Sequence, residues 1–435
     1  MNHPGTAVRT RFRPLRGEVS PQPPITMRSE SGGGPGEEAT MKAVTWHGRR
    51  DVRVEEVPDP ILKEPNDAIV RITSSGLCGS DLHLYETLGP FMGEGDILGH
   101  EPMGIVEEVG PETGGLSVGD RVVMPFQICC GHCWMCNQGL HTQCETTQVR
   151  DQGMGAALFG FSKLYGEVPG AQAEFLRVPE AQFMPIKVPE GPPDERFLFL
   201  SDVLPTAWQS VAYADVPEGG TLLVLGLGPI GDMASRIALL QGKRVIGVDL
   251  VPERLARVKA RGAEVIDLSV VDDVGEEVRS LTGGRGADAV VDAVGMEAHG
   301  SPVAEMGQRV FNVLPKRITA PLMNKVGLDR MAAIYTAIDA VRRGGTVSLI
   351  GVYGGQSDPM PMLTLFDKQI QLRMGQANIK RWVDEIMPLL LDDADPLGTE
   401  GFATHQVSLD DAPAAYQNFQ KKQDGTVKVV FKPGS

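Results

Sequence analysis

The sequence predicts an α/β protein in which a doubly wound parallel sheet is inserted into a discontinuous, mostly β domain. Three observations lead to this prediction. Short runs of alternating apolar and polar residues dominate before residue 202, apolar strands alternate with helices over 203–378, and short mixed elements return over 379–435. Strands that alternate with helices are typical of a parallel sheet with helices on both faces. The β domain is therefore expected at 41–202 and 379–435, with the other domain at 203–378.

The first 40 residues differ from the rest in composition. They are rich in Pro, Gly, Ser and Arg and have almost no apolar periodicity, so we expect a disordered tail over 1–40. Arg9, Arg11, Arg13 and Arg16 precede any acidic residue, as in organelle transit peptides. A solvated tail, or a working start at Met41, explains the segment more simply, and we favour that interpretation.

Regular structure is expected from Met41 onward. Runs that alternate apolar and polar residues and then turn at proline or glycine occur at 41–48, 51–60, 68–81, 102–110 and 119–126. Such runs are typical of half-buried strands. The Gly-rich stretch at 145–173 predicts a long loop, and loops of this length are either functional or disordered.

The pattern changes near residue 202. A helix is predicted over 202–216, and residues 221–250 have the pattern strand, Gly turn, helix, strand. Further apolar strands at 287–295 and 345–354 each end at glycine, and a mostly helical segment is expected at 300–340. A last strand is predicted over 426–433, which returns the chain to the β domain.

Composition excludes some partners. The chain has 435 residues, enough for two or three domains, and its 42% hydrophobic and 22% charged residues are those of a globular protein. A net charge of −15 argues against nucleic acid or an anionic membrane surface as the main partner. No apolar run reaches the roughly 18 residues of a membrane-spanning helix.

Four cysteines form the most specific motif. Cys130, Cys133, Cys136 and Cys144 have the spacing C-x2-C-x2-C-x7-C, which lets four thiolates converge on one tetrahedral cation. All-sulfur sites with no open position are structural zinc sites. Unrelated core or disulfide cysteines are the disfavoured alternative, because five of the six cysteines cluster here and we recognise no signal peptide. Cys129 falls outside the spacing and is expected to be a strand residue.

A glycine turn predicts a dinucleotide site. Gly226, Gly228 and Gly231, with Pro229 and Ile230 between them, follow a predicted strand and open a predicted helix. In that context the glycines let the backbone approach a pyrophosphate at the positive helix N-terminus. The alternative is a βα turn that binds nothing.

Two residues at and beyond the end of the next strand are candidates to contact the adenosine ribose. Asp249 ends that strand, where a carboxylate accepts hydrogen bonds from ribose hydroxyls and repels a 2′-phosphate, so NAD is expected rather than NADP. Arg254 either reaches the same ribose or is a solvated helix residue.

Three scattered residues have the chemistry of zinc ligands. Cys78, His100 and Asp202 offer sulfur, imidazole and carboxylate, and three protein ligands leave a fourth position open for chemistry. Taken alone, such scattered residues do not define a site, since a lone Cys or His is more often a core or surface residue.

The order of motifs resembles the zinc-dependent medium-chain alcohol dehydrogenases. It runs GLCGSDLH at 76–83, GHE at 99–101, the four-cysteine motif, then GLGPIG at 226–231. The resemblance covers the chain from about Met41 to its end. LSDVLPTAWQ at 200–209, the long loop near 160 and the helical segment near 310 are similar to the glutathione-independent formaldehyde dehydrogenase branch.

The resemblance implies a fold and partners. A Rossmann domain is inserted in a GroES-like catalytic domain, and each chain holds two zinc ions and uses NAD. The expected substrate is a small-molecule alcohol or aldehyde, with no nucleic acid or membrane as partner. A cytoplasmic homo-oligomer, dimer or tetramer, is expected.

By resemblance, Cys78, His100 and Asp202 hold a catalytic zinc. The sequence departs from the alcohol dehydrogenase set of two Cys and one His, because Asp202 stands where the second cysteine is expected. The formaldehyde dehydrogenase branch also has aspartate there. Glu101 matches a family glutamate close to the metal, which either supports a ligand from behind, binds the metal transiently or has a structural role.

Ser80 and His83 form the proton relay of the family, by the same resemblance. A hydroxyl near the metal and a titratable imidazole suit proton transfer, while a turn cap and a surface histidine are the alternatives. Some family members have an arginine before this serine that contacts the pyrophosphate. Here it is Gly79, so the contact is absent or comes from elsewhere, and Lys428 is our candidate.

Several functions compete. The leading hypothesis is NAD-linked oxidation of an alcohol to an aldehyde or ketone by hydride transfer. A narrower one is formaldehyde dehydrogenation or dismutation with tightly held NAD. A catalytically silent NAD-binding sensor is disfavoured because Cys78, Ser80, His83 and His100 are all present. A quinone reductase is disfavoured because quinone reductases of this fold have no metal, whereas this sequence has a set of zinc ligands.

Overall fold

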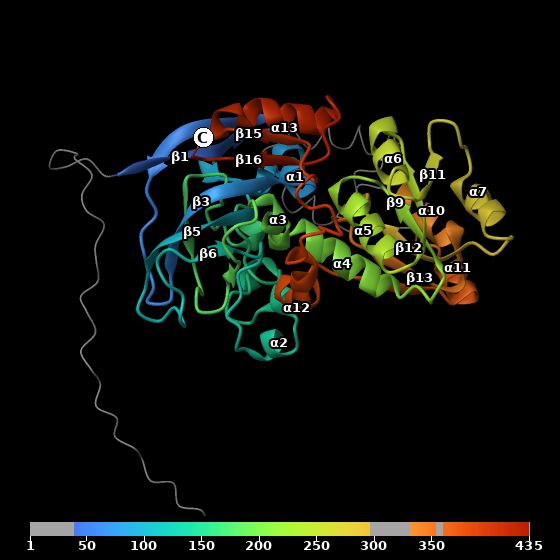
Figure 1. Cartoon of the computed structure of the whole chain (residues 1–435), viewed down its shortest axis with the longest axis horizontal. Helices are drawn as coiled ribbons and strands as arrows, with labels where there is room; N and C mark the ends of the chain where they lie inside the picture. Colours follow the sequence, from blue (N-terminus) through green and yellow to red (C-terminus); the bar gives the residue numbers. More distant parts are fainter. Residues whose placement is uncertain (1–38, 296–330, 354–359, 435) are drawn as a thin grey trace, which may run out of the picture. The chain divides into compact units, whose positions relative to one another are not determined.

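The computed structural model describes residues 39–295, 331–353 and 360–434, and Figure 1 labels its helices and strands. In this part of the chain the strands form three sheets. We call the part built on the three-stranded and seven-stranded sheets the β lobe, and the part built on the six-stranded sheet the parallel-sheet lobe. The predicted tail, up to residue 38, and the predicted helical segment, up to residue 330, lie outside the described residues.

The β lobe contains mostly antiparallel strands. The three-stranded sheet has the order β2-β1-β4, and the other has the order β15-β16-β3-β5-β6-β8, with β7 also paired to β3. The strands are β1 (Thr40–Gly48), β2 (Asp51–Pro58), β3 (Ala68–Leu77), β4 (Asp96–Ile97), β5 (Glu101–Val109), β6 (Arg121–Val123), β7 (Phe175–Val178), β8 (Ile186–Lys187), β15 (His405–Val407) and β16 (Val429–Phe431).

The end of the chain completes the β lobe. Strand β16 pairs antiparallel with β3, with Val429 opposite Leu77 and Phe431 opposite Ser75. Its side chains Val429, Val430 and Phe431 are buried, so the pairing is driven by apolar burial as well as by the ladder. The predicted discontinuous β domain is therefore confirmed, although the last strand spans three residues rather than the eight expected.

The parallel-sheet lobe has the strand order β11-β10-β9-β12-β13-β14, with every neighbouring pair parallel. Its strands are β9 (Thr221–Leu225), β10 (Arg244–Asp249), β11 (Glu264–Asp267), β12 (Ala287–Asp292), β13 (Val341–Leu349) and β14 (Gln371–Met374). The order reverses between β9 and β12, and ligands of open α/β sheets bind outside the strand ends at such a switch point.

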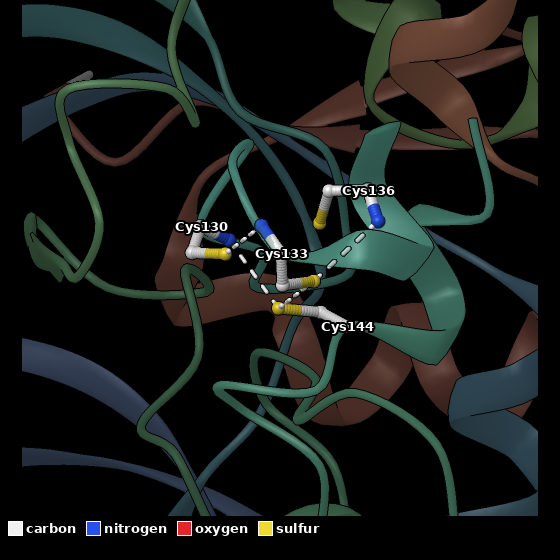
Figure 2. Close-up of side chains that lie close together, drawn as sticks. All are labelled: Cys130, Cys133, Cys136 and Cys144. Carbon is white, nitrogen blue, oxygen red and sulfur yellow. Dashed lines mark hydrogen bonds between the residues drawn. The ribbon is translucent and has the colours of Figure 1, made fainter. Parts of the chain in front are cut away.

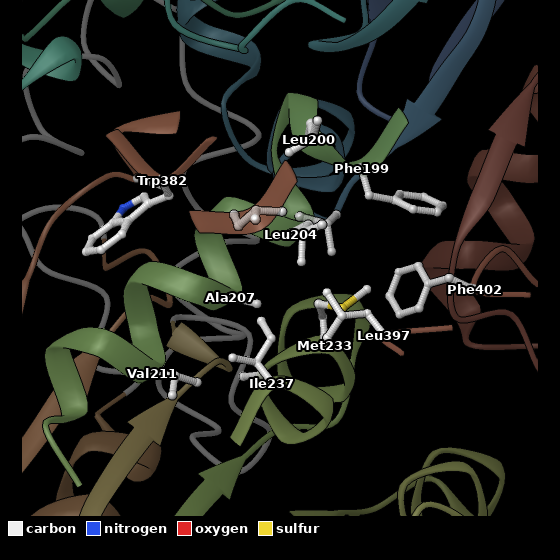
Figure 3. Packing of buried hydrophobic residues seen from close by; sticks show 14 of the residues in the cluster. Phe199, Leu200, Leu204, Ala207, Val211, Met233, Ile237, Trp382, Leu397 and Phe402 are labelled. Atoms are coloured by element: carbon white, nitrogen blue, oxygen red, sulfur yellow. The ribbon is translucent and has the colours of Figure 1, made fainter. Parts of the chain in front are cut away.

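Helices cover both faces of this sheet. They are α4 (Val203–Ala214), α5 (Pro229–Leu240), α6 (Pro252–Lys259), α7 (Val274–Leu281), α10 (Ala332–Ala340) and α11 (Met362–Lys368). Leu222 and Val224 of β9 pack in one apolar cluster with α4 and α5, part of which Figure 3 shows. Leu223 and Leu225 pack in a second cluster with α7 and α10. Alternate side chains of β9 thus point to opposite faces of the sheet. The strand is apolar throughout because helices cover both faces.

Five helices belong to the β lobe or join the two lobes. They are α1 (Gly79–Glu86), α2 (Trp134–Asn137), α3 (Glu195–Leu198), α12 (Ile379–Leu390) and α13 (Ala412–Lys421). In the described ranges, no helix combines the length and the apolar character needed to cross a membrane.

The long loop at 145–173 is ordered. It contains two short 3-10 helices, Arg150–Gln152 and Lys163–Tyr165, and it forms isolated bridges between Gln148 and Ala156 and between Phe159 and Val168. Of the two alternatives for this loop, the structure therefore excludes disorder.

Candidate active site

The four cysteines of the C-x2-C-x2-C-x7-C motif converge from one loop and the short helix α2, as Figure 2 shows. Their sulfur atoms all lie within 4.8 Å of one another. Backbone N–H groups point at these sulfurs: Cys130 Sγ accepts from Cys133 at 3.4 Å, Cys133 Sγ from Cys136 at 3.4 Å, and Cys144 Sγ from Cys130 at 3.4 Å. Four convergent sulfurs with N–H donors fit a tetrahedral structural zinc site.

The local sequence explains why the loop folds this way. Gly131 has φ +79°, and a Cβ there would lie 2.3 Å from the ring of Phe183, so only glycine fits. Burial raises the pKa of the Cys130 thiol to about 11. Holding all four sulfurs as thiolates near neutral pH therefore needs a bound cation.

Cys129 is not the strand residue that the sequence predicted. It lies in a loop beyond β6, fully buried, and its N–H donates to Met184 Sδ at 3.2 Å. Strand β6 ends at Val123, so the pairing of that segment stops earlier than the apolar run indicates.

Cys78, His100 and Asp202 also come together. Cys78 follows the end of β3 and is the N-cap of α1, whereas His100 precedes β5, the neighbour of β3. Asp202 is the N-cap of α4. Gly76 of β3 lies opposite Glu101 of β5, so this register brings the Cys78 and His100 segments side by side. The three residues, together with Glu101, offer ligand atoms that lie within 4.8 Å of one another.

The distances fit a tetrahedral cation. Asp202 Oδ2 lies 3.4 Å from Cys78 Sγ and 3.4 Å from His100 Nε2. The edge of a tetrahedron whose centre is about 2.1 Å from each ligand is about 3.4 Å long. Burial raises the pKa of the Cys78 thiol to about 11, with the Asp202 and Glu101 carboxylates as further causes. A divalent cation is therefore the natural partner of this buried sulfur, imidazole and carboxylate set.

Two residues that the sequence reasoning missed orient the candidate ligands. Asp81 Oδ1 lies 3.2 Å from His100 Nδ1, while its Oδ2 accepts from the N–H of Cys78 at 2.9 Å. Thr206 Oγ1 donates to Asp202 Oδ1 at 2.6 Å. Outer partners of this kind fix the orientation of metal ligands. Asp81 stands within GLCGSDLH, so the motif itself carried that signal.

Glu101 and Lys428 form a buried ion pair. Lys428 Nζ lies 2.6 Å from Glu101 Oε1 and donates to the carbonyl of Leu77 at 3.0 Å, and both side chains are fully buried. Gly76 makes room for the carboxylate, because a Cβ there would meet Glu101 Oε2 at 2.0 Å. The assignment of Lys428 to a cofactor pyrophosphate stays a prediction, and in the structure its charge faces Glu101.

A cavity of about 370 Å³ runs between the lobes. From the β lobe it is lined by Cys78, Gly79, Ser80, Leu82, His83, Phe419 and Lys422. From the parallel-sheet lobe it is lined by residues that the sequence predicted to bind the cofactor: Gly226, Gly228, Pro229, Ile230, Asp249 and Arg254. The end of β12 and the segment after β13 add Ala293, Val294, Gly351 and Val352. It therefore joins one cysteine of the buried cluster to the glycine turn.

The glycine turn has the expected local geometry. Gly226 has φ +81°, and a Cβ at Gly231 would lie 1.8 Å from the carbonyl oxygen of Gly226, so neither position accepts a side chain. Gly228 is the N-cap of α5, and Pro229 and Ile230 open that helix. A helix N-terminus that begins at such a turn can hold an anionic phosphate.

Asp249 anchors the turn as well as facing the cavity. Its Oδ2 accepts from the N–H of Leu227 at 2.7 Å, and its Oδ1 accepts from Leu250 at 2.7 Å and from Val251 at 2.9 Å. Arg254 Nη1 lies 3.9 Å from Asp249 Oδ2, and its side chain is 11% exposed, so the arginine is at the same end of the cavity rather than a solvated helix residue. The sequence reasoning missed Phe419 and Lys422, which reach the cavity only because α13 folds back onto the β lobe.

Fold and site together have the arrangement of a two-lobe dehydrogenase, with a glycine turn suited to a dinucleotide in one lobe and two clusters suited to metal ions in the other. Residues 64–189 match the alcohol dehydrogenase GroES-like domain family, and residues 229–306 match the zinc-binding dehydrogenase family. The chain belongs to the zinc-dependent medium-chain alcohol dehydrogenases, and family members are oxidoreductases that act on alcohols.

Relatives and solved structures agree with this family. The chain is 38% identical over 397 residues to an uncharacterized zinc-type alcohol dehydrogenase-like protein, AdhB, of Bacillus subtilis, covering 90% of this chain and 100% of the relative. It is 32% identical to a formaldehyde dismutase of Pseudomonas putida, covering 91% of this chain and 98% of that protein. The alcohol dehydrogenase TADH of Thermus sp. ATN1 superposes with a TM-score of 0.75 at 32% identity, covering 90% and 99% of the two chains.

Proposed function

We propose that this protein oxidises a small alcohol to an aldehyde or ketone, with NAD as hydride acceptor and with two zinc ions per chain, one of them catalytic. One observation carries the proposal: a single cavity is lined both by Cys78, Ser80 and His83 and by the glycine turn with Asp249. A cofactor bound at the turn and a substrate held near Cys78 therefore share one enclosure, as hydride transfer requires.

The four-cysteine cluster and the cluster of Cys78, His100 and Asp202 have different roles in this proposal. The first offers four sulfurs and no further ligand, so it holds a structural ion that organises its loop. The second offers three ligands and a cavity beside Cys78. A zinc ion held there supplies Lewis acidity that lowers the pKa of an alcohol hydroxyl.

Ser80 and His83 move the proton. The Ser80 hydroxyl lies 3.7 Å from Cys78 Sγ, within reach of a hydroxyl group held beside that sulfur, and both Ser80 and His83 line the cavity. Ser80 would accept the proton of the substrate hydroxyl while giving up its own, and that proton would pass by way of the ribose of a bound nucleotide to His83, which would deliver it to solvent. An imidazole suits the second step because its ordinary pKa lies near neutrality.

NAD is the proposed dinucleotide. Asp249 lies at the end of β10 and lines the cavity, where its carboxylate accepts ribose hydroxyls and opposes a 2′-phosphate. Arg254 and Lys422 add two cations to the cavity wall, which suits the pyrophosphate. With Gly79 lacking a side chain, Lys422 is a second candidate for that contact beside Lys428.

Two aromatic side chains pack against the candidate ligand His100. The rings of Phe126 and Phe161 meet His100 edge to face, with centroids 6.4 and 6.5 Å away and interplanar angles of 84°. These rings pack against the imidazole of His100 and hold its orientation.

A second candidate function is formaldehyde dehydrogenation or dismutation with permanently held NAD. It is favoured by the 32% identity to the formaldehyde dismutase of Pseudomonas putida and to the glutathione-independent formaldehyde dehydrogenase of Pseudomonas aeruginosa, and by the aspartate at position 202. In a dismutase the bound cofactor is reduced and reoxidised in one cycle, so no added NAD is needed.

A substrate panel separates these functions. Short primary and secondary alcohols and formaldehyde are incubated with and without added NAD. NADH formation is followed by absorbance, and formaldehyde consumption is measured directly because a dismutase forms no net NADH. The acid extract of freshly purified protein is assayed for NAD in parallel. Turnover with alcohols that depends on added NAD supports the leading proposal, whereas stoichiometric extracted NAD with formaldehyde turnover supports the second. No turnover on any alcohol or on formaldehyde contradicts both and leaves a silent NAD-binding sensor.

A further inference from the structure

Gln209 is a fully buried polar side chain in the middle of α4, on the helix face that also carries Thr206 and Asp202. Its neighbours Leu204, Ala207 and Val211 lie in the apolar cluster of Figure 3. Burying an amide is costly unless its groups are hydrogen-bonded. The position of Gln209 therefore needs an explanation beyond packing.

All four hydrogen-bonding positions of this amide are used. Oε1 accepts from the N–H of Asn378 at 3.0 Å and from Trp382 Nε1 at 3.1 Å. Nε2 donates to the carbonyl oxygens of Gly375 and Gln376 at 3.3 and 3.1 Å. A fully satisfied buried group of this kind fixes one arrangement of the segments that it joins.

The partners of Gln209 belong to the segment that leaves the parallel sheet. Strand β14 ends at Met374 and α12 begins at Ile379, so residues 375–378 carry the chain from the parallel-sheet lobe toward α12. Gly375 in this segment has φ +146°, a backbone conformation that favours glycine. Gln209 thus clamps a crossing between the lobes to α4.

Asn378 connects the same crossing to the four-cysteine loop. Its Oδ1 accepts from both the N–H and the Oγ1 of Thr142, each at 3.0 Å, and Thr142 lies two residues before Cys144. Asn378 and Thr142 are both buried. The metal loop is therefore attached to the crossing segment through one amide oxygen.

Gln209 is connected to the candidate catalytic ligands in two ways, along its own helix and through a chain of side-chain contacts. Along α4, Asp202, Thr206 and Gln209 are four and three residues apart and share one helix face, with Thr206 bonded to Asp202. The other route starts at Gln376.

Gln376, whose carbonyl accepts from Gln209, donates through its own Nε2 to Tyr165 Oη at 2.8 Å. The Tyr165 ring meets Phe161 at 5.5 Å, and Phe161 meets His100 at 6.5 Å. The two routes thus end at two different ligands of one cluster.

We propose that Gln209 and Asn378 form a positioning junction through which the four-cysteine loop sets the orientation of Asp202 and His100 and the approach of the two lobes. The junction touches neither substrate nor cofactor. It rests on the proposed hydride transfer between lobes, because the distance from cofactor to substrate is what it controls. Misplacing reacting groups by about 1 Å can lower kcat about 100-fold.

Two pairs of variants test the junction in the zinc-loaded full chain. Gln209→Met keeps the volume and removes the amide. Ser210→Ala is its control, because the Ser210 hydroxyl donates to the Ala207 carbonyl within its own helix. Thr142→Val removes the hydroxyl donated to Asn378 and keeps the shape, whereas Thr142→Ser keeps the hydroxyl. The second pair decides the question if Gln209→Met does not fold.

We expect Gln209→Met to lower kcat about 10- to 100-fold and Thr142→Val about 3- to 10-fold, with NADH affinity unchanged. The deuterium isotope effect on kcat should rise in both, which a mere loss of folded protein does not cause. Ser210→Ala and Thr142→Ser should keep the wild-type values. Equal kcat and equal isotope effects within each pair overturn the proposal.

A readout without turnover separates this proposal from the proposed function. With cobalt in the cluster of Cys78, His100 and Asp202, the visible absorption bands report ligand geometry. They should shift in Gln209→Met and Thr142→Val and not in the controls. Wild-type protein that oxidises no alcohol contradicts the proposed function, and unshifted cobalt bands in both variants contradict the junction.

Discussion

Replacing Asp202 by alanine is the most direct perturbation of the candidate active site. Asp202 is 7% exposed, and its Oδ2 lies 3.4 Å from both Cys78 Sγ and His100 Nε2. The change leaves two ligands for a divalent cation and removes one of the two negative charges that balance it. Removing partners that only orient a metal ligand costs 10- to 100-fold in affinity.

Loss of a ligand itself should therefore cost at least about 1,000-fold, or about 4 kcal/mol of binding free energy. We expect Asp202→Ala to hold one zinc per chain, in the four-cysteine cluster, where the wild type holds two. Alcohol-dependent NADH formation should fall by at least the same factor. Zinc per chain is measured by elemental analysis after gel filtration.

Asp202→Cys is the matched control, because two cysteines and one histidine hold the catalytic zinc of alcohol dehydrogenase. It should keep two zinc ions and part of the activity, with a stability loss of about 1 kcal/mol because Thr206 loses its acceptor. Two zinc ions per chain in Asp202→Ala would falsify the ligand assignment. Loss of both ions in Asp202→Cys would instead indicate that the carboxylate is needed to fold the lobe.

Three further predictions concern the cofactor and acid stability. Asp249→Ala should lower the ratio of kcat/KM for NAD over NADP at least about 10-fold, because the carboxylate that opposes a 2′-phosphate is gone; an unchanged ratio in steady-state kinetics contradicts the role of Asp249. Tyr353→Phe should lower the free energy of unfolding in urea by about 1–3 kcal/mol and raise KM for NAD. The Tyr353 hydroxyl donates to the buried carboxylate of Asp292, whose other oxygen accepts from the N–H of Val294 beside the cavity. Unchanged stability and unchanged KM refute this prediction. Burial, with Lys380 and Arg381 nearby, lowers the pKa of His141 to about 4. At a pH below the ordinary histidine pKa, His141 is therefore protonated in the unfolded chain but stays neutral in the folded chain. The free energy of unfolding of the wild type should therefore fall by about 2 kcal/mol between pH 7 and pH 5 because of His141. Urea unfolding of His141→Gln should show a fall that is smaller by about that amount.

Local motifs could be predicted from the sequence because their geometry is set by residues close in the chain. Gly226 and Gly231 are required by backbone contacts within one turn, and the four cysteines lie in one loop and one short helix. The fold class followed from the same local signals. Residue-level strand ends did not, as Cys129 shows, because pairing depends on a partner strand.

Long-range pairs could not be predicted. Lys428 reaches Glu101 only because β16 pairs with β3, and no local pattern reports that register. Lys422 and Phe419 enter the cavity for the same reason, through the placement of α13. The sequence pointed to Lys428 as the cation near the pyrophosphate, whereas the fold offers Lys422 at the cavity wall.

The origin of the three candidate ligands explains why the junction at Gln209 matters. Cys78 and His100 come from neighbouring strands of one sheet, so their spacing is set within the β lobe. Asp202 comes from the start of α4, a helix that packs with α5 in the parallel-sheet lobe. The cluster therefore forms correctly only when α4 is correctly placed. A change that shifts α4 should alter the metal geometry and the hydride transfer together, which is why the cobalt bands and the isotope effect on kcat are measured in the same variants.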